Sequence, residues 1–163
     1  GKTSLLRLLA GLEQATSGAV QPVPRGAGYV PQTCTESLFP WFSVLRNAAM
    51  PRLISGHADA LDVARSYLKR VAPQLELQRK ARGLSGGEAQ ALSLARALTA
   101  PGPVVLADEP FSALASSSRS ELRQALSAAL GDRALVLVTH QLEDALALHA
   151  RVYRLSSGRL AAS

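Results

Sequence analysis

Residues 104–110 read Val-Val-Leu-Ala-Asp-Glu-Pro, four apolar residues that lead directly into two carboxylates and a proline. A short apolar run of this kind predicts a strand buried on both faces, as in a parallel sheet. Ligands bind at the carboxyl ends of parallel strands, where Asp108 and Glu109 would lie. Asp108 would hold Mg²⁺ there, and Glu109 would orient and polarise an attacking water. The alternative is that two solvated acids simply end a strand.

The segments around this strand alternate between short apolar runs and amphipathic helices. This pattern predicts an α/β protein with a largely parallel sheet flanked by helices. Two more buried strands are expected at Ala27–Pro31 and Leu135–Val138, and a hairpin at 152–161. Residues 33–83 carry weak strand signals and several helix cues. They therefore predict a helical insertion within the α/β body.

Capping residues set the expected bounds of the helices. Ser43 is a suitable cap for a short helix that would end before Pro51, and Ser116 is one for a later helix. A first helix is expected over Thr3–Ala10 and a longer one over about Gly87–Thr99.

The chain begins with Gly1-Lys2-Thr3-Ser4, at the start of the first expected helix. This is the second half of the phosphate-binding pattern G-x-x-x-x-G-K-[ST]. The N–H groups at a helix start attract phosphate oxygens, Lys2 would reach the outer phosphates, and the Thr3 hydroxyl could ligate Mg²⁺. On its own, the pattern also fits an ordinary helix start with a solvated lysine.

The segment Ser85-Gly86-Gly87-Glu88 opens the longer helix. Ser85 with Glu88 three residues later is a capping box, which explains both residues structurally. A cap does not require two consecutive glycines, however. Gly86 and Gly87 let the backbone approach a ligand closely at a helix N-terminus that suits an anion, so both interpretations can hold together.

Length and composition bound the class of protein. The 163 residues are about one domain's worth, and 47% apolar against 18% charged residues argues against disorder. The longest unbroken apolar run, Ala134–Val138, is far short of the ~20 residues that cross a bilayer, so we expect a soluble, cytosolic chain. The single Cys34 excludes an intramolecular disulfide. The net charge of +6 is spread along the chain, which favours solvated charge over a nucleic-acid surface.

In this order and spacing, the motifs resemble those of the ATP-binding-cassette (ABC) ATPases, a class of P-loop NTPase. Gly1–Ser4 are similar to the end of the Walker A motif, Leu84–Gly87 to the family signature, and Val104–Glu109 to Walker B. The resemblance implies that Gln32 is the Q-loop glutamine, which senses Mg²⁺ and the attacking water. It also implies that His140 is the switch histidine, which contacts the γ-phosphate. The expected cofactors are ATP and Mg²⁺.

The resemblance covers the whole chain and implies one ABC ATPase domain over residues 1–163, with a helical subdomain at about 33–100 between the Q-loop and the signature. The family's first strands and the front of its phosphate loop are absent upstream of Gly1, so we expect a fragment or a truncated gene product. An inactive truncated cassette is therefore one alternative. The expected site residues are Gln32, Glu109 and His140 for catalysis, Gly1, Lys2, Thr3, Ser4, Ser85, Gly86 and Gly87 for nucleotide binding, and Thr3, Gln32 and Asp108 for the metal.

The sequence departs from the family pattern just after the carboxylates. Family members usually have Asp after Ser-Ala-Leu, whereas here Ser112-Ala113-Leu114 is followed by Ala115. In the family this loop crosses the dimer interface. Because Ala115 replaces the usual Asp of this loop, we expect weaker communication between the two nucleotide sites of a dimer.

The resemblance also implies partners. Two cassettes would face each other head to tail, with Ser85 and Gly87 of one closing over the γ-phosphate held by the other. The pair would drive a transmembrane permease from the cytoplasmic, inner face of the cell membrane, and a periplasmic or extracellular solute-binding protein would deliver the solute. Residues Leu38–Asn47 and 109–114 resemble importers of the nitrate, sulfonate and taurine type.

Three aromatic residues, Phe39, Trp41 and Phe42, stand together shortly after Gln32. Such a cluster is either part of the core or an exposed docking patch. In the family, this segment receives a coupling helix from the membrane-spanning partner. The resemblance therefore implies that these aromatics contact the permease.

ATPases of DNA repair and chromosome maintenance are the other class to weigh, because they share the signature and both Walker motifs. Those proteins insert long coiled coils between the Q-loop and the signature. Here Gln32 and Ser85 are 53 positions apart, and no heptad repeat lies between them. This spacing favours a transporter subunit, and no nucleic-acid partner is expected.

Overall fold

The strand that ends in the two carboxylates lies at the centre of the sheet. In the computed structural model, which describes residues 1–162, the strand order is β1 (Gly28–Val30), β2 (Val104–Asp108) and β3 (Ala134–Val138). Both pairings are parallel, with Tyr29 opposite Leu106 and Leu106 opposite Val136. Four of the five β2 residues are buried, which confirms the predicted strand covered on both faces.

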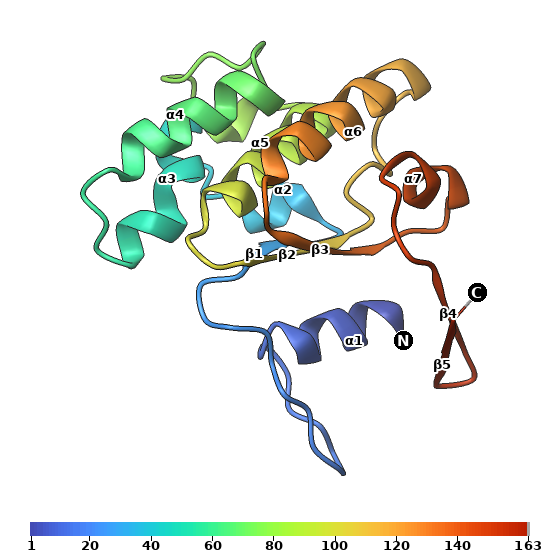
Figure 1. Ribbon diagram of the computed structural model, residues 1–163. Helices are drawn as coiled ribbons and strands as arrows, with labels where there is room; N and C mark the ends of the chain where they lie inside the picture. Colours follow the sequence, from blue (N-terminus) through green and yellow to red (C-terminus); the bar gives the residue numbers. More distant parts are fainter. Residues whose placement is uncertain (163) are drawn as a thin grey trace.

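Helices cover the two faces of the sheet unequally. Figure 1 shows α1 on one side and the helices α2 to α6 on the other. The helices that precede β2 are α1 (Lys2–Leu9), α2 (Cys34–Ser37), α3 (Val44–Ile54), α4 (Ala60–Val71), the short 3₁₀ helix Ala81–Gly83 and α5 (Gly86–Thr99). Those that follow it are α6 (Ser116–Leu130) and α7 (Leu142–Ala147), before the antiparallel hairpin of β4 (Tyr153–Ser156) and β5 (Arg159–Ala162). This arrangement confirms the predicted α/β class.

Helix α5 is the central element of the larger layer. It contacts α2, α3, α4, α6 and β1, and nearly all of its residues from Ala89 to Thr99 are buried. A helix that is apolar around most of its circumference belongs in a core. The segment 33–83, predicted as a helical insertion, contains α2, α3, α4 and the 3₁₀ helix, and all three α-helices pack against α5.

Two predicted helix bounds were wrong. Helix α3 begins after Ser43, whose hydroxyl accepts a hydrogen bond from the Arg46 N–H as expected, but it continues through Pro51 to Ile54. Packing of α3 against α4 and α5 outweighs the preference of proline to end a helix. Helix α6 includes Ser116, and its N-cap is Ala115, which has no side chain that could bond the free N–H groups.

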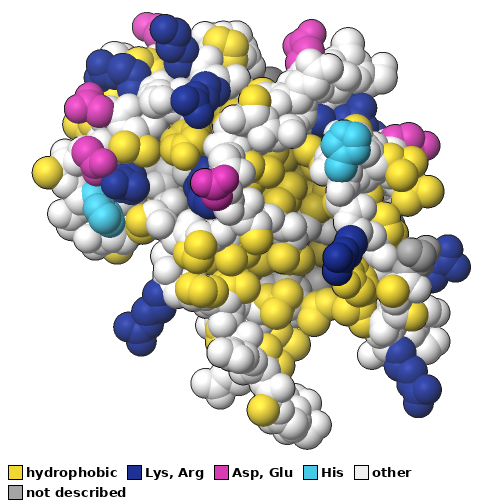
Figure 2. Space-filling view, in the orientation of Figure 1, with side chains coloured by type: hydrophobic (Ala, Val, Ile, Leu, Met, Phe, Trp, Pro, Cys, Tyr) yellow, Lys and Arg dark blue, Asp and Glu magenta, His cyan; other side chains and the backbone are white. Residues whose placement is uncertain are grey.

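An apolar groove of about 570 Å³ lies between α1, β3 and the β4–β5 hairpin. Hydrophobic side chains extend across the middle of this face of the molecule (Figure 2).

Within residues 1–162, no helix has both the length and the apolar character needed to cross a membrane.

Close contact between β1 and α5 depends on Gly28. A Cβ built on Gly28 would lie 2.1 Å from the backbone oxygen of Ala97, well inside contact distance. The three nearest atoms all belong to the backbone of Ala97, so they cannot rotate away as a flexible side chain would. Only glycine allows the strand to lie this close to the helix.

We expect Gly28→Ala to lower the free energy of unfolding by about 2–3 kcal/mol, because α5 must move away from β1. Urea denaturation followed by circular dichroism measures the change. Gly83→Ala is the matched control, since a Cβ there meets only the end of the Arg79 side chain at 3.9 Å. If Gly28→Ala and Gly83→Ala have equal stabilities, the contact between β1 and α5 at Gly28 is not rigid.

Candidate functional site

A polar cavity of about 210 Å³ opens at the carboxyl ends of β2 and β3, beside the start of α1. Seven of the residues that line it were predicted site residues, although they come from four separate parts of the sequence. The lining consists of Gly1, Lys2, Thr3, Gln32, Asp108, Glu109, Val138 and His140. The structure therefore brings the first helix, the strand-end acids, the glutamine and the histidine to one place.

Asp108 carries a buried carboxylate that makes no hydrogen bond. The residue is 1% exposed, and neither carboxylate oxygen has a partner within the protein. A buried, unpaired carboxylate is costly unless a cation or a donor completes it. Thr3 lines the same cavity, and a carboxylate with a hydroxyl is an oxygen ligand set that fits a hard cation such as Mg²⁺.

No group of three or more His, Cys, Asp or Glu side chains in residues 1–162 is arranged to hold a metal ion. A cation at Asp108 would therefore have few carboxylate or imidazole ligands from the protein. Mg²⁺ commonly binds in this way, through one or two protein oxygens together with substrate phosphates and water.

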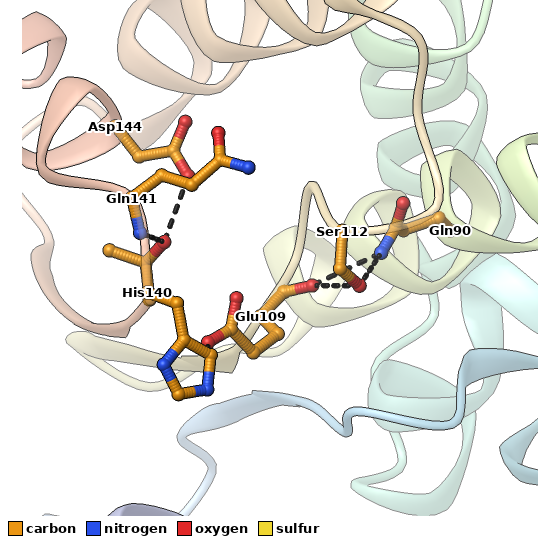
Figure 3. A network of polar contacts seen from close by, with 7 residues as sticks. Gln90, Glu109, Ser112, His140, Gln141 and Asp144 are labelled. Carbon is orange, nitrogen blue, oxygen red and sulfur yellow. Dashed lines mark hydrogen bonds and ion pairs between the residues drawn. The ribbon is translucent and has the colours of Figure 1, made fainter.

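Glu109 has an unusual backbone conformation. Its φ is 50°, in the left-handed region, where non-glycine residues are rare. Its N–H donates to the carbonyl of Val138 on β3 at 2.9 Å, and its own carbonyl accepts hydrogen bonds from the Gln90 amide at 3.1 Å and the Ser112 hydroxyl at 3.0 Å. These contacts hold the residue on both sides, and Figure 3 draws those with Gln90 and Ser112.

The electrostatic surroundings of Glu109 favour proton uptake. Burial raises the pKa of its carboxyl above the ordinary value, and the neighbouring Asp108 raises it further, while His140 and Lys2 act in the opposite direction. Nε2 of His140 lies 3.3 Å from Oε1 of Glu109, an ion-pair contact when the histidine is protonated. The His140 side chain is otherwise largely exposed, so it reaches the cavity from the solvent side.

The loop that carries His140 is fixed by a buried acid that sequence reasoning missed. Asp144, 3% exposed on α7, pairs with Arg123 of α6 at 2.9 Å and accepts a hydrogen bond from the Thr139 hydroxyl at 2.9 Å. The same hydroxyl accepts from the Gln141 N–H at 3.0 Å, so His140 stands between two tethered residues. Figure 3 shows the part of this chain that links Asp144 to Gln141, next to His140. Local sequence gives no signal for it, because Arg123 and Asp144 lie on different helices.

Four predicted nucleotide-binding residues, Ser4 and Ser85–Gly87, do not line this cavity. Ser85 caps α5, where its hydroxyl accepts from the Glu88 N–H and its own N–H donates to the Glu88 carboxylate. The predicted capping box is thus confirmed. A Cβ on Gly87 would lie 3.0 Å from the Leu114 side chain, so this helix start packs against the loop that follows the carboxylates.

The aromatic cluster lies in a surface turn, with Trp41 exposed and Phe39 and Phe42 half-buried. Trp41 is 63% exposed, and its ring contacts those of Phe39 and Phe42 at centroid distances of 6.0 and 6.1 Å. The buried Asn47 side chain holds the turn, because it bonds the Phe39 N–H and carbonyl and the carbonyls of Phe42 and Ser43. Asn47 thus holds the backbone of a turn that exposes the Trp41 indole to solvent, and an exposed apolar ring of this kind suits a contact surface.

A helix start that faces strand-end acids across a polar cavity defines a P-loop nucleotide-binding fold. Residues 1–112 match the ABC transporter family. The chain belongs to that family.

Two curated relatives illustrate the match. An uncharacterised ABC transporter ATP-binding protein of Haemophilus influenzae is 37% identical over 165 residues, covering 96% of this chain and 67% of that protein. An aliphatic sulfonates import ATP-binding protein of Nocardia farcinica is 40% identical over 166 residues, covering 100% of this chain and 64% of that protein. The chain thus spans about two thirds of the length of these relatives.

Solved structures agree with the fold. A dimeric ATP-binding cassette in a post-hydrolysis state, bound to ADP and Pi, superimposes with a TM-score of 0.82 at 26% identity, over 99% of this chain and 80% of that one. A putative metal-chelate type ABC transporter in an inward-facing conformation gives 0.80 at 27% identity, over 100% of this chain and 68% of that one. The relatives' names support the transporter interpretation and not the DNA-repair alternative.

We expect Asp144→Ala to lower the free energy of unfolding by about 3–5 kcal/mol, since it leaves the Arg123 guanidinium largely buried without its partner. Thermal and urea denaturation measure the loss. Glu143→Ala, at the exposed neighbouring position of α7, should change stability by less than about 0.5 kcal/mol. Equal free energies of unfolding for Asp144→Ala and Glu143→Ala would mean that the Arg123–Asp144 pair does not hold the loop that carries His140.

Proposed function

We propose that this chain is the ATP-binding and ATP-hydrolysing subunit of an ABC importer. The observation that carries the proposal is the polar cavity, in which six other predicted residues meet around the unpartnered carboxylate of Asp108. Several relatives are named as import ATP-binding proteins, among them that of Nocardia farcinica, and these names support the same activity.

The start of α1 would hold the phosphates of ATP. Helix α1 has no side-chain cap on its first N–H groups, so these donors are available to an anion. Lys2 lines the cavity and would neutralise charge on the outer phosphates, as in other phosphate-binding loops. Gly1 and Ser4 would contribute backbone or hydroxyl donors at the same helix end.

Thr3, Gln32 and Asp108 would hold Mg²⁺, which fits the buried carboxylate oxygens that lack a partner. When bound, the ion supplies Lewis-acid polarisation of the phosphate oxygens. The protein's part is to present oxygen ligands at a fixed place, with Asp108 held at the end of a buried strand.

Glu109 would act as the general base. A water oxygen attacks the γ-phosphorus, its proton passes to the Glu109 carboxylate, and the bond from phosphorus to the bridging oxygen of ADP breaks. Burial makes the carboxylate a stronger base because it raises its pKa. His140, 3.3 Å from Oε1 of Glu109, would contact the γ-phosphate, and Gln32 would orient the water.

A second cassette would complete the site. Ser85, Gly86 and Gly87 lie outside the chain's own cavity, at a helix start whose first residues are exposed. They are therefore available to the nucleotide of a partner arranged head to tail. Dimeric cassettes among the similar solved structures support this assembly.

The exposed aromatic turn would contact a transmembrane permease at the inner, cytoplasmic face of the cell membrane. Phe39, Trp41 and Phe42 supply its apolar surface. A solute-binding protein would deliver the solute outside. The relatives that import aliphatic sulfonates support a sulfonate-type importer, and no nucleic-acid partner is proposed.

We expect Glu109→Gln to keep ATP affinity within about twofold and to slow hydrolysis ~100- to 10,000-fold, because the proton acceptor is lost. Phosphate release and calorimetric titration measure the two quantities. Glu121→Gln, an exposed carboxylate on α6, is the control and should leave both unchanged. Normal turnover in Glu109→Gln would remove Glu109 from the role of base.

We expect Trp41→Ser to release the subunit from its permease while ATP hydrolysis in solution stays within about twofold, because the indole is exposed and packs little of the core. Co-purification with the permease measures release. Leu61→Ser, an exposed apolar residue on α4, is the control. Retained binding in Trp41→Ser would refute the docking role, and its unfolding would show that the turn belongs to the core.

A further inference from the structure

We propose that Gln90 is a positioning residue for hydrolysis, which holds the backbone of Glu109 and joins it to the signature turn, Ser85–Gly87, of the same chain. The proposal rests on the proposed function of Glu109. It assigns a role to a side chain that touches neither the cavity nor its expected ligands.

The amide of Gln90 is buried and directs all of its bonds to one loop. The residue is 2% exposed on α5, among apolar neighbours. Its Nε2 donates to the Glu109 carbonyl at 3.1 Å and to the Ser112 hydroxyl at 3.5 Å, and its Oε1 accepts from the Ala113 N–H at 3.3 Å. A buried amide is retained where its hydrogen bonds matter, since its burial without them is unfavourable.

Glu109 requires such a tether because its conformation opposes its local preference. Pro110 follows it, and a residue before proline favours extended backbone. The observed φ of 50° is left-handed instead. Contacts elsewhere in the fold must maintain a conformation of this kind. Here they are the Val138 carbonyl on one side and Gln90 with Ser112 on the other.

The same loop packs against the signature turn. A Cβ on Gly86 would lie 3.9 Å from the Ala113 Cβ, and one on Gly87 would lie 3.0 Å from the Leu114 side chain. Gln90 is one helical turn further along α5 and bonds the Ala113 N–H. A displacement of the signature turn therefore moves Gln90, which lies on the same helix. Gln90 passes the displacement to Glu109 through its hydrogen bonds to the Glu109 carbonyl and the Ala113 N–H.

Gln90→Met tests the role, because it keeps the length and packing of the side chain and removes its three hydrogen bonds. We expect kcat per nucleotide-binding site to fall at least about tenfold with KM for ATP within about twofold, the pattern of a lost transition-state contribution. Thr99→Val is the control. It removes another buried hydrogen bond of α5, to the Ala95 carbonyl, away from the loop. It should leave both constants unchanged.

A double-variant cycle separates positioning from general destabilisation. Because Gln90 acts through Glu109, Gln90→Met should have no further effect on turnover in a Glu109→Gln background. Independent, multiplicative losses would overturn the proposal. If Gln90→Met does not fold, Gln90→Leu serves instead, since its side chain is apolar and can neither donate to the Glu109 carbonyl nor accept from the Ala113 N–H. A normal kcat in that variant would overturn the proposal too.

Two outcomes separate the role of Gln90 from the ATPase activity of the chain. Absence of ATP hydrolysis by the unaltered protein would refute the function itself. Hydrolysis by the unaltered protein, with Gln90→Met equal to Thr99→Val, would refute only the role of Gln90.

Discussion

The burial of α5 constrains the rest of the structure. Two polar side chains of this buried helix, Gln90 and Arg96, bond neighbouring elements, and those bonds fix the neighbours in turn. Arg96 reaches the carbonyl and hydroxyl of Ser37 at the end of α2, and Gln90 reaches the loop after β2. The close approach of β1 at Gly28 places the sheet against the same helix. Core packing and the placement of the polar cavity are therefore parts of one arrangement.

Two acids in the cavity, Asp108 and Glu109, are in environments that lower the stability of the free protein. Asp108 is buried without a partner, and Glu109 is both buried and left-handed. Such features persist when the surrounding fold over-determines them, and they are typical of functional sites. Lys2 and His140 offset part of the acidic charge. The remaining charge favours a bound cation and its phosphate ligand.

Much of the fold and of the cavity could be predicted from the sequence. Apolar runs that end in polar residues located the parallel strands, and motif spacing assigned the acids, Lys2 and Thr3. Gln32 and His140 needed the family resemblance, since a lone residue at a strand end has no distinctive pattern. The Arg123–Asp144 pair and the bonds of Gln90 could not be predicted, because they join elements far apart in sequence. Pro51 was misleading for a related reason: tertiary packing overrides a local helix-breaking preference.

The start of α6 at Ala115 has a consequence for local opening. Without a capping side chain, the first amides of this helix have neither an intrahelical acceptor nor a side-chain substitute. They should exchange with deuterated solvent far faster than the amides of β2, which are paired on both sides. The short segment from Glu109 to Ala115 therefore joins one of the most protected parts of the chain to one of the least protected. Opening is thus confined to the start of α6, because the bonds of Gln90 hold the loop at Glu109 and at Ala113.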